Sequence, residues 1–285
     1  MSGFGSPAEI GVAQYLLMMI EEIGDGTAAL PHTVGHFPGT PNTLDADGRL
    51  GTDLLTCIID SIGGMTSGLA SLPDWIVTTN LMIRRAPNAL TGSCGTGELT
   101  LNTHVLRRGR SAVVTRVEVA DLNGSPVATS WMSCAILTPA NGPPAFNRPD
   151  KPFERDVPND PIFAAPTHEF FNLSVSDTPG VVHLSIEQRL RNPWGILHGG
   201  SSAVALDAAA RSLVVGRSTV EPTPEAIVTD LAVHYLSPGR VGPIVATATS
   251  AGRSGPDHLV RVEVRDQGAE DRLMALAMTT VHQLD

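Results

Sequence analysis

One stretch of the sequence carries residue types that could act on a polarised carbonyl group. The segment from Asn192 to Gly200 is an irregular Pro/Gly turn that ends in His198 and two glycines, and the small and apolar residues after it contain no helix breaker before Gly216. Glycine lets a backbone approach a ligand closely because it has no Cβ atom. The free N–H groups at a helix start suit a carbonyl oxygen or an oxyanion. We therefore expect a helix to begin after His198 and to offer such a site.

A carboxylate also lies inside this predicted helix. Asp207 follows His198 by nine residues. Asp is a poor helix former and costly to bury, so a helix interior rarely needs it for structure alone. Nine residues of helix rise about 13 Å, which places Asp207 too far along its own helix to serve a ligand held at His198. A carboxylate for that ligand has to come from a neighbouring helix.

These residues resemble the motif of the hotdog-fold thioesterases, specifically the PaaI-like group within the 4-hydroxybenzoyl-CoA thioesterase superfamily. That motif has an Asn, a His-Gly-Gly six residues later, and an Asp or Glu nine residues beyond the His. The positions that match it in type and spacing are Asn192, His198, Gly199, Gly200 and Asp207. The resemblance covers residues 168–285 directly, and it implies hydrolysis of an acyl-CoA thioester to a free acid and CoA.

The resemblance also implies roles for the motif residues. The N–H groups of Gly199 and Gly200 would stabilise the charge that develops on the thioester oxygen. Asn192 would orient the attacking water or the carbonyl, and His198 would set the loop or donate to the thioester. CoA would enter as part of the substrate, so no separate cofactor is expected.

The two halves of the chain look like diverged copies. Three short matches occur in the same order, namely Ile76-Val-Thr78 with Ile227-Val-Thr229, Arg116-Val-Glu-Val119 with Arg261-Val-Glu-Val264, and Asp60 with Asp207. The length of 285 residues suits two hotdog units. We predict an α+β fold of two tandem hotdog domains, each a long central helix wrapped by an antiparallel sheet. The expected parts are an N-terminal domain at 1–138, a Pro-rich linker at 139–166 and a C-terminal domain at 167–285.

Hydrophobic periodicity predicts the elements that would position the site. Helices are expected over residues 7–23, over 51–72 and after His198. The segment 30–50 is expected to be rich in turns. Strands are expected at 75–85, 95–107, 111–121 and 126–138, and then at 168–176, 181–189, 226–236, 241–252, 258–266 and 272–284. Asn123-Gly124 is a good hairpin turn.

In the resembling family two hotdogs pair about a two-fold axis, and each loop faces the acid of its partner. We therefore expect the loop 192–200 to meet Asp60 and Thr78 of the first half. Asp60 would act as a general base on water, or attack directly to give a mixed anhydride, while Thr78 would hold the water. A reciprocal site would combine Asp207 and Thr229 with the loop of the first half.

That first-half loop has diverged. Gly51, not His, stands nine residues before Asp60, and no His-Gly-Gly is present there. One competent site per chain is the preferred interpretation. A second motif, Gly35-His36-Phe-Pro-Gly39, resembles one found in hotdog β-hydroxyacyl-carrier-protein dehydratases, in which a His precedes a helical Glu by fourteen residues. Here Asp60 lies 24 residues after His36 (60 − 36). A dehydratase or enoyl hydratase is therefore one alternative, and a non-catalytic acyl-CoA-binding protein is another.

Charge and composition limit the classes of molecule that the protein is expected to bind. The formal net charge of −10 argues against nucleic acid and against an anionic membrane surface. A local group of arginines could still bind the CoA phosphates, and Arg84, Arg85 and Arg240 are the candidates. Sequence motifs typical of metal sites are missing, so no metal is expected.

The cysteines and the N-terminal segment predict the cellular location of the protein. The three cysteines, Cys57, Cys94 and Cys134, lack CxxC spacing and are expected to be reduced, as in a cytoplasmic protein. The N-terminal segment has neither the pattern of a signal peptide nor that of a membrane span. The outer edges of two-hotdog sheets need a partner surface, so a homo-oligomer is expected.

Overall fold

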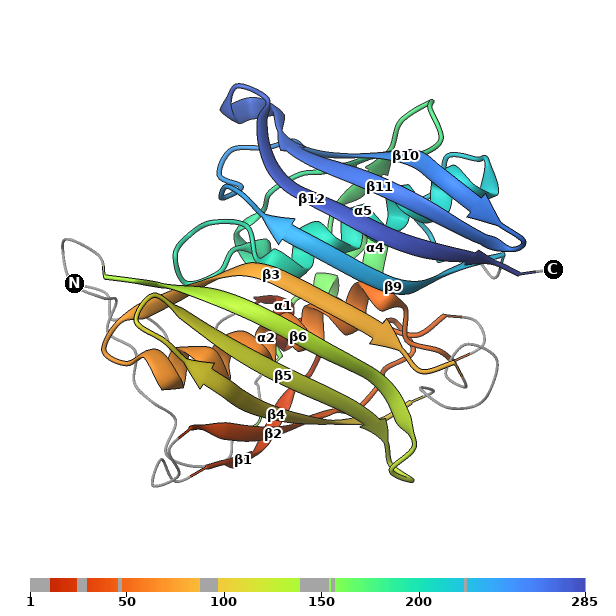
Figure 1. Cartoon of the computed structure of the whole chain (residues 1–285). Coiled ribbons are helices and arrows are strands. Elements are labelled where there is room, and N and C mark those ends of the chain that lie inside the picture. The colour runs from red at the N-terminus through yellow and green to blue at the C-terminus, as the bar shows by residue number, and fades with distance from the viewer. Residues whose placement is uncertain are drawn as a thin grey trace.

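Two long helices lie side by side at the centre of the molecule, as the computed structural model shows (Figure 1). The helices are α2 (Thr52–Ser71) and α5 (Gly199–Val215). The structure describes residues 11–24, 30–45, 48–87, 97–138, 154, 157–222 and 225–284. By length and composition α2 could cross a membrane, but 72% of its most apolar window is buried inside the fold. It is therefore positioned as a core helix, which explains why it is apolar on most sides.

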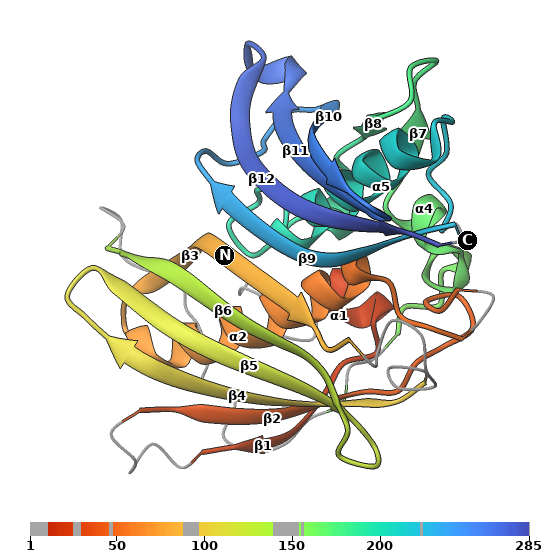
Figure 2. The ribbon, with the colours of Figure 1, turned by 45° about the vertical axis from the view of Figure 1, so that its right-hand side comes forward.

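A single antiparallel sheet of twelve strands wraps both helices (Figures 1 and 2). Its spatial order is β1-β2-β4-β5-β6-β3-β9-β12-β11-β10-β8-β7. The strands of the first half are β1 (Met19–Ile23), β2 (His32–Phe37), β3 (Trp75–Arg85), β4 (Leu99–Arg108), β5 (Ala112–Asp121) and β6 (Pro126–Leu137). Those of the second half are β7 (Leu173–Val175), β8 (Val181–Leu184), β9 (Ala226–Tyr235), β10 (Ile244–Ser254), β11 (Asp257–Asp266) and β12 (Arg272–Gln283).

The two halves join through β3 and β9, which pair antiparallel with Met82 opposite Ala232. Each half places its long helix against the concave side of its own strands, so the halves are related by an approximate two-fold axis through this pair (Figure 1). The strands alternate buried and exposed positions, as one-sided burial requires. The predicted α+β fold of two hotdog units is thus confirmed, and Gly124 adopts the positive φ of 79° that the predicted hairpin turn favours.

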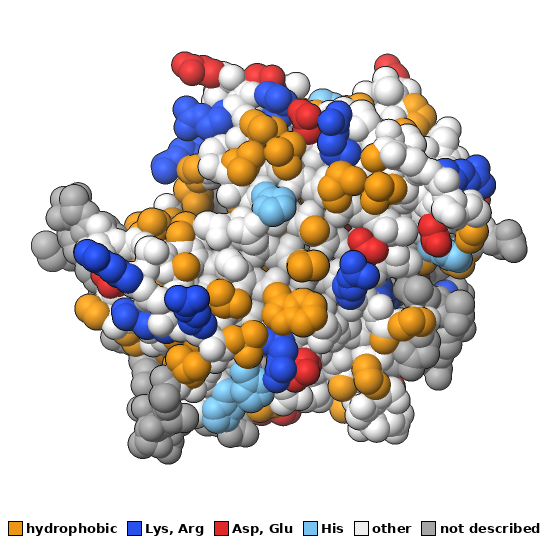
Figure 3. Space-filling view, viewed as in Figure 1, with side chains coloured by type: hydrophobic (Ala, Val, Ile, Leu, Met, Phe, Trp, Pro, Cys, Tyr) orange, Lys and Arg blue, Asp and Glu red, His pale blue; other side chains and the backbone are white. Residues whose placement is uncertain are grey.

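The face of the sheet turned away from the helices carries exposed apolar side chains (Figure 3). Trp131, Met82 and Met278 are 42%, 41% and 38% exposed, and the first two are cross-strand partners. Ala232 lies between Met82 and Met278, so the apolar side chains form a row across four strands. The homo-oligomer expected from the sequence remains a prediction.

Four predictions of secondary structure are wrong. The helix expected over 7–23 is short: residues 7–10 lie outside the described residues, α1 covers only Gly11–Tyr15, and Leu17 turns the chain with a φ of 50°. The rest of that segment is β1, because Met18 and Ile20 are buried with a period of two and the strand pairs with β2. The segment 30–50, expected to be turns, contains the strand β2.

The strand expected at 168–176 begins as a short helix, α4 (Thr167–Phe170), because aromatic packing decides this region. Phe170 stacks on Tyr15 with ring centroids 3.9 Å apart. Three 3₁₀ turns complete the described elements, namely η2 (Pro161–Ala164), η3 (Gln188–Leu190) and η4 (Gln267–Ala269). The strand expected at 181–189 ends at Leu184 as β8, and the 3₁₀ turn η3 follows it. Most of the predicted linker, including residues 139–153, lies outside the described residues, as does Cys94.

Candidate active site

Asp60, in the middle of α2, faces the first turn of α5. Its Oδ2 accepts a hydrogen bond from the Gly200 N–H at 3.0 Å, and the Nδ1 of His198 lies 3.5 Å from the same oxygen. Both side chains are 6% exposed. The carboxylate of one half therefore lies against the helix N-terminus of the other half, as the spacing argument predicted.

The two glycines of the motif are required by this close approach. A Cβ atom on Gly199 would lie 2.7 Å from Asp60 Oδ2, and one on Gly200 would lie 2.6 Å from the Cα of Cys57. The second contact involves backbone, which cannot move aside cheaply. The glycines thus let α5 begin directly against α2 and bring a backbone N–H within reach of the carboxylate.

His198 is the N-cap of α5. Its Nδ1 accepts from the Gly200 N–H at 3.1 Å, so this N–H is shared between the imidazole and Asp60. The other ring nitrogen, Nε2, lies 3.5 Å from the Ser61 hydroxyl. Among the described residues no hydrogen-bond partner is found for the Gly199 N–H, which makes it the donor available to a ligand oxygen.

Thr78 on β3 completes the surroundings of the carboxylate. Its hydroxyl donates to Asp60 Oδ1 at 2.9 Å. Both carboxylate oxygens are therefore held, one by a side chain of the first half and the other by a backbone amide of the second. A carboxylate fixed at both oxygens is well oriented to accept a proton from water.

Asn192 shapes the loop in this structure. Its Oδ1 accepts from the N–H groups of Trp194 and Ile196, at 3.0 and 3.4 Å. Trp194 in turn donates its indole N–H to the Ile76 carbonyl at 3.3 Å and contacts Trp75 edge-on. The oxygen of Asn192 is occupied within the loop, so only its Nδ2 amide could orient a substrate group.

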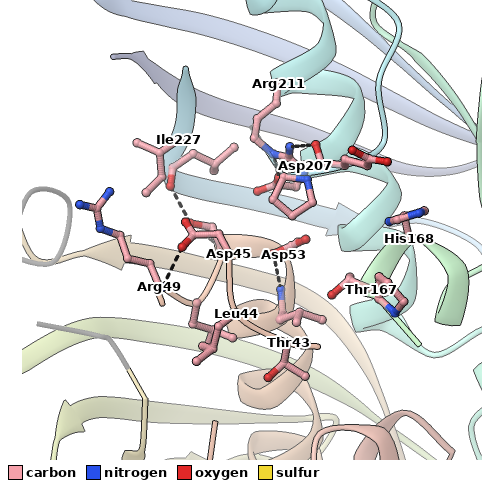
Figure 4. Close-up of a pocket in the computed structure, with 18 of the residues that line it drawn as sticks. Thr43, Leu44, Asp45, Arg49, Asp53, Thr167, His168, Asp207, Arg211 and Ile227 are labelled. Carbon is pink, nitrogen blue, oxygen red and sulfur yellow. Dashed lines mark hydrogen bonds and ion pairs between the residues drawn. The ribbon is translucent and has the colours of Figure 1, made fainter. Parts of the chain in front are cut away.

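A cavity of about 420 Å³ opens at the reciprocal position, where the N-terminus of α2 meets α5 (Figure 4). The charged side chains in its wall include Asp53, Asp207 and Arg211. Asp207 does not stand free: its Oδ1 accepts from Arg211 Nε at 2.5 Å, and Arg211 also donates to the Glu221 carbonyl. Asp53 faces the same cluster and accepts from the Leu54 N–H at 2.7 Å in the first turn of its own helix.

This cluster is coupled electrostatically. Burial, and then the nearby Asp207 carboxylate, raise the pKa of Asp53 to about 6, against the opposing effects of Arg211, the Leu54 N–H and Arg85. Burial disfavours the charged form of Arg211, but Asp207 and Asp53 outweigh it and raise the pKa of the guanidinium above its ordinary value. Arg211 is therefore a cation, and its guanidinium occupies the Oδ1 of Asp207.

The predicted pairing of Asp207 with Thr229 is wrong. Thr229 donates to the Thr280 carbonyl at 3.3 Å, as Thr79 does to the Ser133 carbonyl at 3.0 Å. Both threonines are the extra residue of a β-bulge. Thr229 is therefore equivalent to Thr79 (229 − 79 = 150).

On the same offset Thr78 is equivalent to Val228 (228 − 78 = 150), which lines the cavity beside Asp207 without a hydroxyl. The three-residue match had aligned Thr78 with Thr229, one residue away from the structural equivalence. A β-bulge cannot be recognised in so short a match.

The candidate phosphate-binding arginines differ in exposure. Arg85 is only 7% exposed and donates to the Leu50 carbonyl at 2.7 Å, so its proposed contact with CoA is not supported. Arg84 and Arg240 are exposed. Arg240 lies beside the motif loop, because Gly239 accepts from the Leu197 N–H. His36, the residue of the dehydratase-like motif, lies on β2 with Glu21 and Glu98 each 3.6 Å away, and not at Asp60.

Three residues around Asp60 and Asp207 were not predicted as site residues from the sequence. Arg211 was detectable, because it follows Asp207 by four residues and so shares its helix face. Asp53 carried a weaker signal as an acid in the first turn of a predicted helix. Tyr235 had no such signal: its hydroxyl donates to the Gly199 carbonyl at 3.1 Å from a strand 36 residues away in sequence.

No protein-family model and no curated protein sequence matches this chain. Solved structures do match it. The tesB protein of Mycobacterium avium subspecies paratuberculosis superimposes with a TM-score of 0.61 at 11% identity, over 97% of this chain and all of that one, 100%. The acyl-CoA thioesterase II TesB2 of Mycobacterium marinum gives 0.53 at 12% identity, over 96% and 98%. The 12:0-ACP thioesterase of Umbellularia californica gives 0.56 at 8% identity, over 89% and 94%.

These matches extend over both halves and nearly the whole length of each neighbour. At such low sequence identities the matches show a shared backbone fold and give no information on individual side chains. They agree with the twelve-stranded sheet and the two central helices described above. The chain therefore has the double-hotdog fold found in these thioesterases.

Proposed function

We propose that this chain is a thioesterase that hydrolyses acyl-CoA thioesters to a free acid and CoA, at a single site built around Asp60. The observation that carries the proposal is the position of this carboxylate, 3.0 Å from the Gly200 N–H at the start of α5. The Asp60 carboxylate and the Gly199 N–H, which has no partner among the described residues, lie at the same helix N-terminus. This combination suits attack of water on a carbonyl.

The steps follow from this arrangement. Asp60 removes a proton from a water molecule while the water oxygen bonds to the thioester carbon, and the π electrons of the carbonyl move to its oxygen. The Gly199 N–H donates to that oxygen. When the tetrahedral intermediate collapses, the C–S bond breaks and Asp60 returns its proton to the departing CoA sulfur. Gly200 and Thr78 keep the carboxylate in place throughout.

An exposed arginine near the loop suits the anionic part of CoA. Arg240 lies next to Gly239, which hydrogen-bonds the motif loop. Arg84, by contrast, is exposed on β3 at the opposite end from Ile76, the residue that Trp194 of the loop contacts. A guanidinium at Arg240 could pair with a phosphate without being buried. Replacing Arg240 with Ala should raise KM for acyl-CoA without lowering kcat.

The test is a panel of saturated, enoyl and aromatic CoA esters with detection of the released thiol. Asp60→Asn keeps the hydrogen-bond acceptor for Gly200 but not the base, so we expect kcat to fall by about 10²- to 10⁴-fold. The matched control is Asp207→Asn, which changes the equivalent acid of the reciprocal cleft and should leave turnover within a factor of about two.

Each alternative function gives a different result in this panel. A hydratase would consume the conjugated double bond of enoyl-CoA without releasing thiol. A binding protein would show calorimetric binding of acyl-CoA with no thiol release by the unmodified protein. Near-normal hydrolysis by Asp60→Asn would refute the role of that carboxylate.

A further inference from the structure

Two hydroxyl groups converge on one backbone oxygen at the start of α5. Tyr235, the last residue of β9, donates to the Gly199 carbonyl oxygen at 3.1 Å. Ser202 donates to the same oxygen at 2.7 Å. The ring of Tyr235 also packs against this residue, because a Cβ built on Gly199 would lie 3.4 Å from the tyrosine Cζ. Among the described residues, the tyrosine hydroxyl hydrogen-bonds the carbonyl of Gly199 and not the Gly199 N–H or the Asp60 carboxylate.

The carbonyl of Gly199 and the N–H of Gly200 belong to the same peptide group. A trans peptide is planar, so its C=O and N–H point in opposite directions and turn together. The Gly200 N–H is the group that donates to Asp60 Oδ2 at 3.0 Å. Whatever fixes the carbonyl of Gly199 therefore also fixes the direction of the N–H that holds the carboxylate.

This peptide lies in the first turn of α5, so the helix sets its general direction. It links two glycines, whose backbone torsions are less restricted than those of any other residue. Larger residues are excluded at both positions by Asp60 and Cys57. The two side-chain hydroxyls therefore add a restraint at the point of α5 where the backbone itself restrains the peptide least. Donors on a carbonyl oxygen also polarise the amide and strengthen its N–H as a donor, to a modest degree.

We propose that Tyr235 is a positioning residue for the proposed thioesterase site: its hydroxyl orients and polarises the Gly199–Gly200 peptide, and through it holds Asp60 in the reactive position. This inference rests on the proposed function for its kinetic consequences. Burial, together with the nearby charge of Asp60, raises the pKa of the Tyr235 phenol well above its usual value, so the hydroxyl stays a donor at every working pH.

The chain offers a matched control, because it contains only two tyrosines. Tyr15 is also buried, and its hydroxyl also donates to backbone carbonyls, those of Asn42 at 3.1 Å and Ala165 at 3.0 Å. Tyr235→Phe and Tyr15→Phe each remove one phenolic donor from a carbonyl. Both changes should lower the melting temperature by a few degrees, but only the first touches the peptide at Asp60.

In a thioester assay we expect Tyr235→Phe to lower kcat by about tenfold, the effect of one lost hydrogen bond, with KM within about twofold of the unmodified protein. Ser202→Ala removes the other donor to the same oxygen and should also lower kcat. Tyr15→Phe should leave kcat unchanged. Equal kcat values for Tyr235→Phe and the unmodified protein would overturn the inference, and so would an equal loss of kcat in both tyrosine variants.

A second readout does not depend on turnover. The amide proton of Gly200 should resonate downfield in the NMR spectrum of glycine-labelled protein, and it should move upfield in Tyr235→Phe but not in Tyr15→Phe. An unmoved Gly200 resonance in Tyr235→Phe would refute the positioning role. If the unmodified protein hydrolyses no thioester but the Gly200 shift is seen, the proposed function fails and the control of this peptide by Tyr235 stands.

Discussion

The two sites at which α2 and α5 meet use the same backbone with opposite side chains. At helix positions related by 147 residues, Asp60 corresponds to Asp207 (207 − 60), but Gly64 corresponds to Arg211 (211 − 64) and Gly200 to Asp53 (200 − 53). Around Asp60, Gly200 donates its helix N–H to the carboxylate, and a Cβ on Gly64 would meet nothing within 4 Å. Around Asp207, in the second cleft, a guanidinium and an additional carboxylate fill the equivalent positions.

The comparison shows that two carboxylates at equivalent helix positions can have opposite surroundings. Asp207 is as buried as Asp60, at 3% against 6% exposure, and lies on an equivalent helix. What differs is the partner of each: uncharged hydrogen-bond donors hold Asp60, and the Arg211 guanidinium holds Asp207. We assign the proposed reaction to Asp60 because these partners are uncharged.

The largest effect is expected when the ion pair of the second cleft is broken. Arg211→Met leaves Asp207 buried beside Asp53 without a cation, so the free energy of unfolding should fall by about 3–5 kcal/mol. Chemical denaturation measures this. Arg217→Met is the control, because the Arg217–Glu225 pair is about half exposed and should contribute at most about 1 kcal/mol. Equal small losses in both variants would show that the buried pair has no special role.

The second test places an arginine beside Asp60, at the position equivalent to Arg211. Gly64 stands four residues after Asp60, and a Cβ there meets nothing within 4 Å. In Gly64→Arg the new guanidinium should pair with Asp60 as Arg211 does with Asp207, and should lower kcat by about 100-fold through loss of the free base. Gly68→Arg is the control, since Gly68 is equally open but two turns from Asp60. Full activity in Gly64→Arg would contradict our account of why the two sites differ.

The third test concerns pH and Asp53. Its pKa of about 6 in the folded state exceeds the ordinary value near 3.9, so the folded state binds the proton more tightly. The stability that Asp53 contributes is therefore fully present below about pH 4 and is lost as the pH rises through about 6. Asp53→Asn should raise the free energy of unfolding at pH 7.5 by about 2–3 kcal/mol and have little effect at pH 4.

The Asn side chain can still accept from the Leu54 N–H, so this hydrogen bond in the first turn of α2 is kept in that variant. Urea titrations at several pH values give the comparison. The expectation fails if the two proteins show parallel stability curves between pH 4 and 7.5.

The smallest effect separates the two threonines that sequence matching had paired. Thr78→Val removes the donor to Asp60 Oδ1 and should lower kcat about tenfold, the effect of one hydrogen bond. Thr229→Val removes only a donor to the Thr280 carbonyl and should leave kcat unchanged. If both variants lost activity equally, the one-residue shift between the halves would have no functional meaning.

Local patterns in the sequence were enough for the central elements. The strand predicted at 75–85 agrees with β3 at both ends, and the helix predicted at 51–72 is α2 to within one residue at each end. Their apolar periodicity is set by burial on one face and needs no knowledge of distant partners. The outer strand β1 was missed because it is only five residues long, and the buried Met18 and Ile20 are too few to distinguish a strand from a helix.

The sequence by itself also determined that a carboxylate has to reach the glycine turn from another helix, since the rise of a helix excludes Asp207 from its own N-terminus. Only the tertiary structure decided which acid is able to act. The β-bulges at Thr79 and Thr229, the Arg211 ion pair and the contact of Tyr235 with Gly199 arise where β3, β9, α2 and α5 meet. Such contacts join residues far apart in the chain, and no local periodicity encodes them.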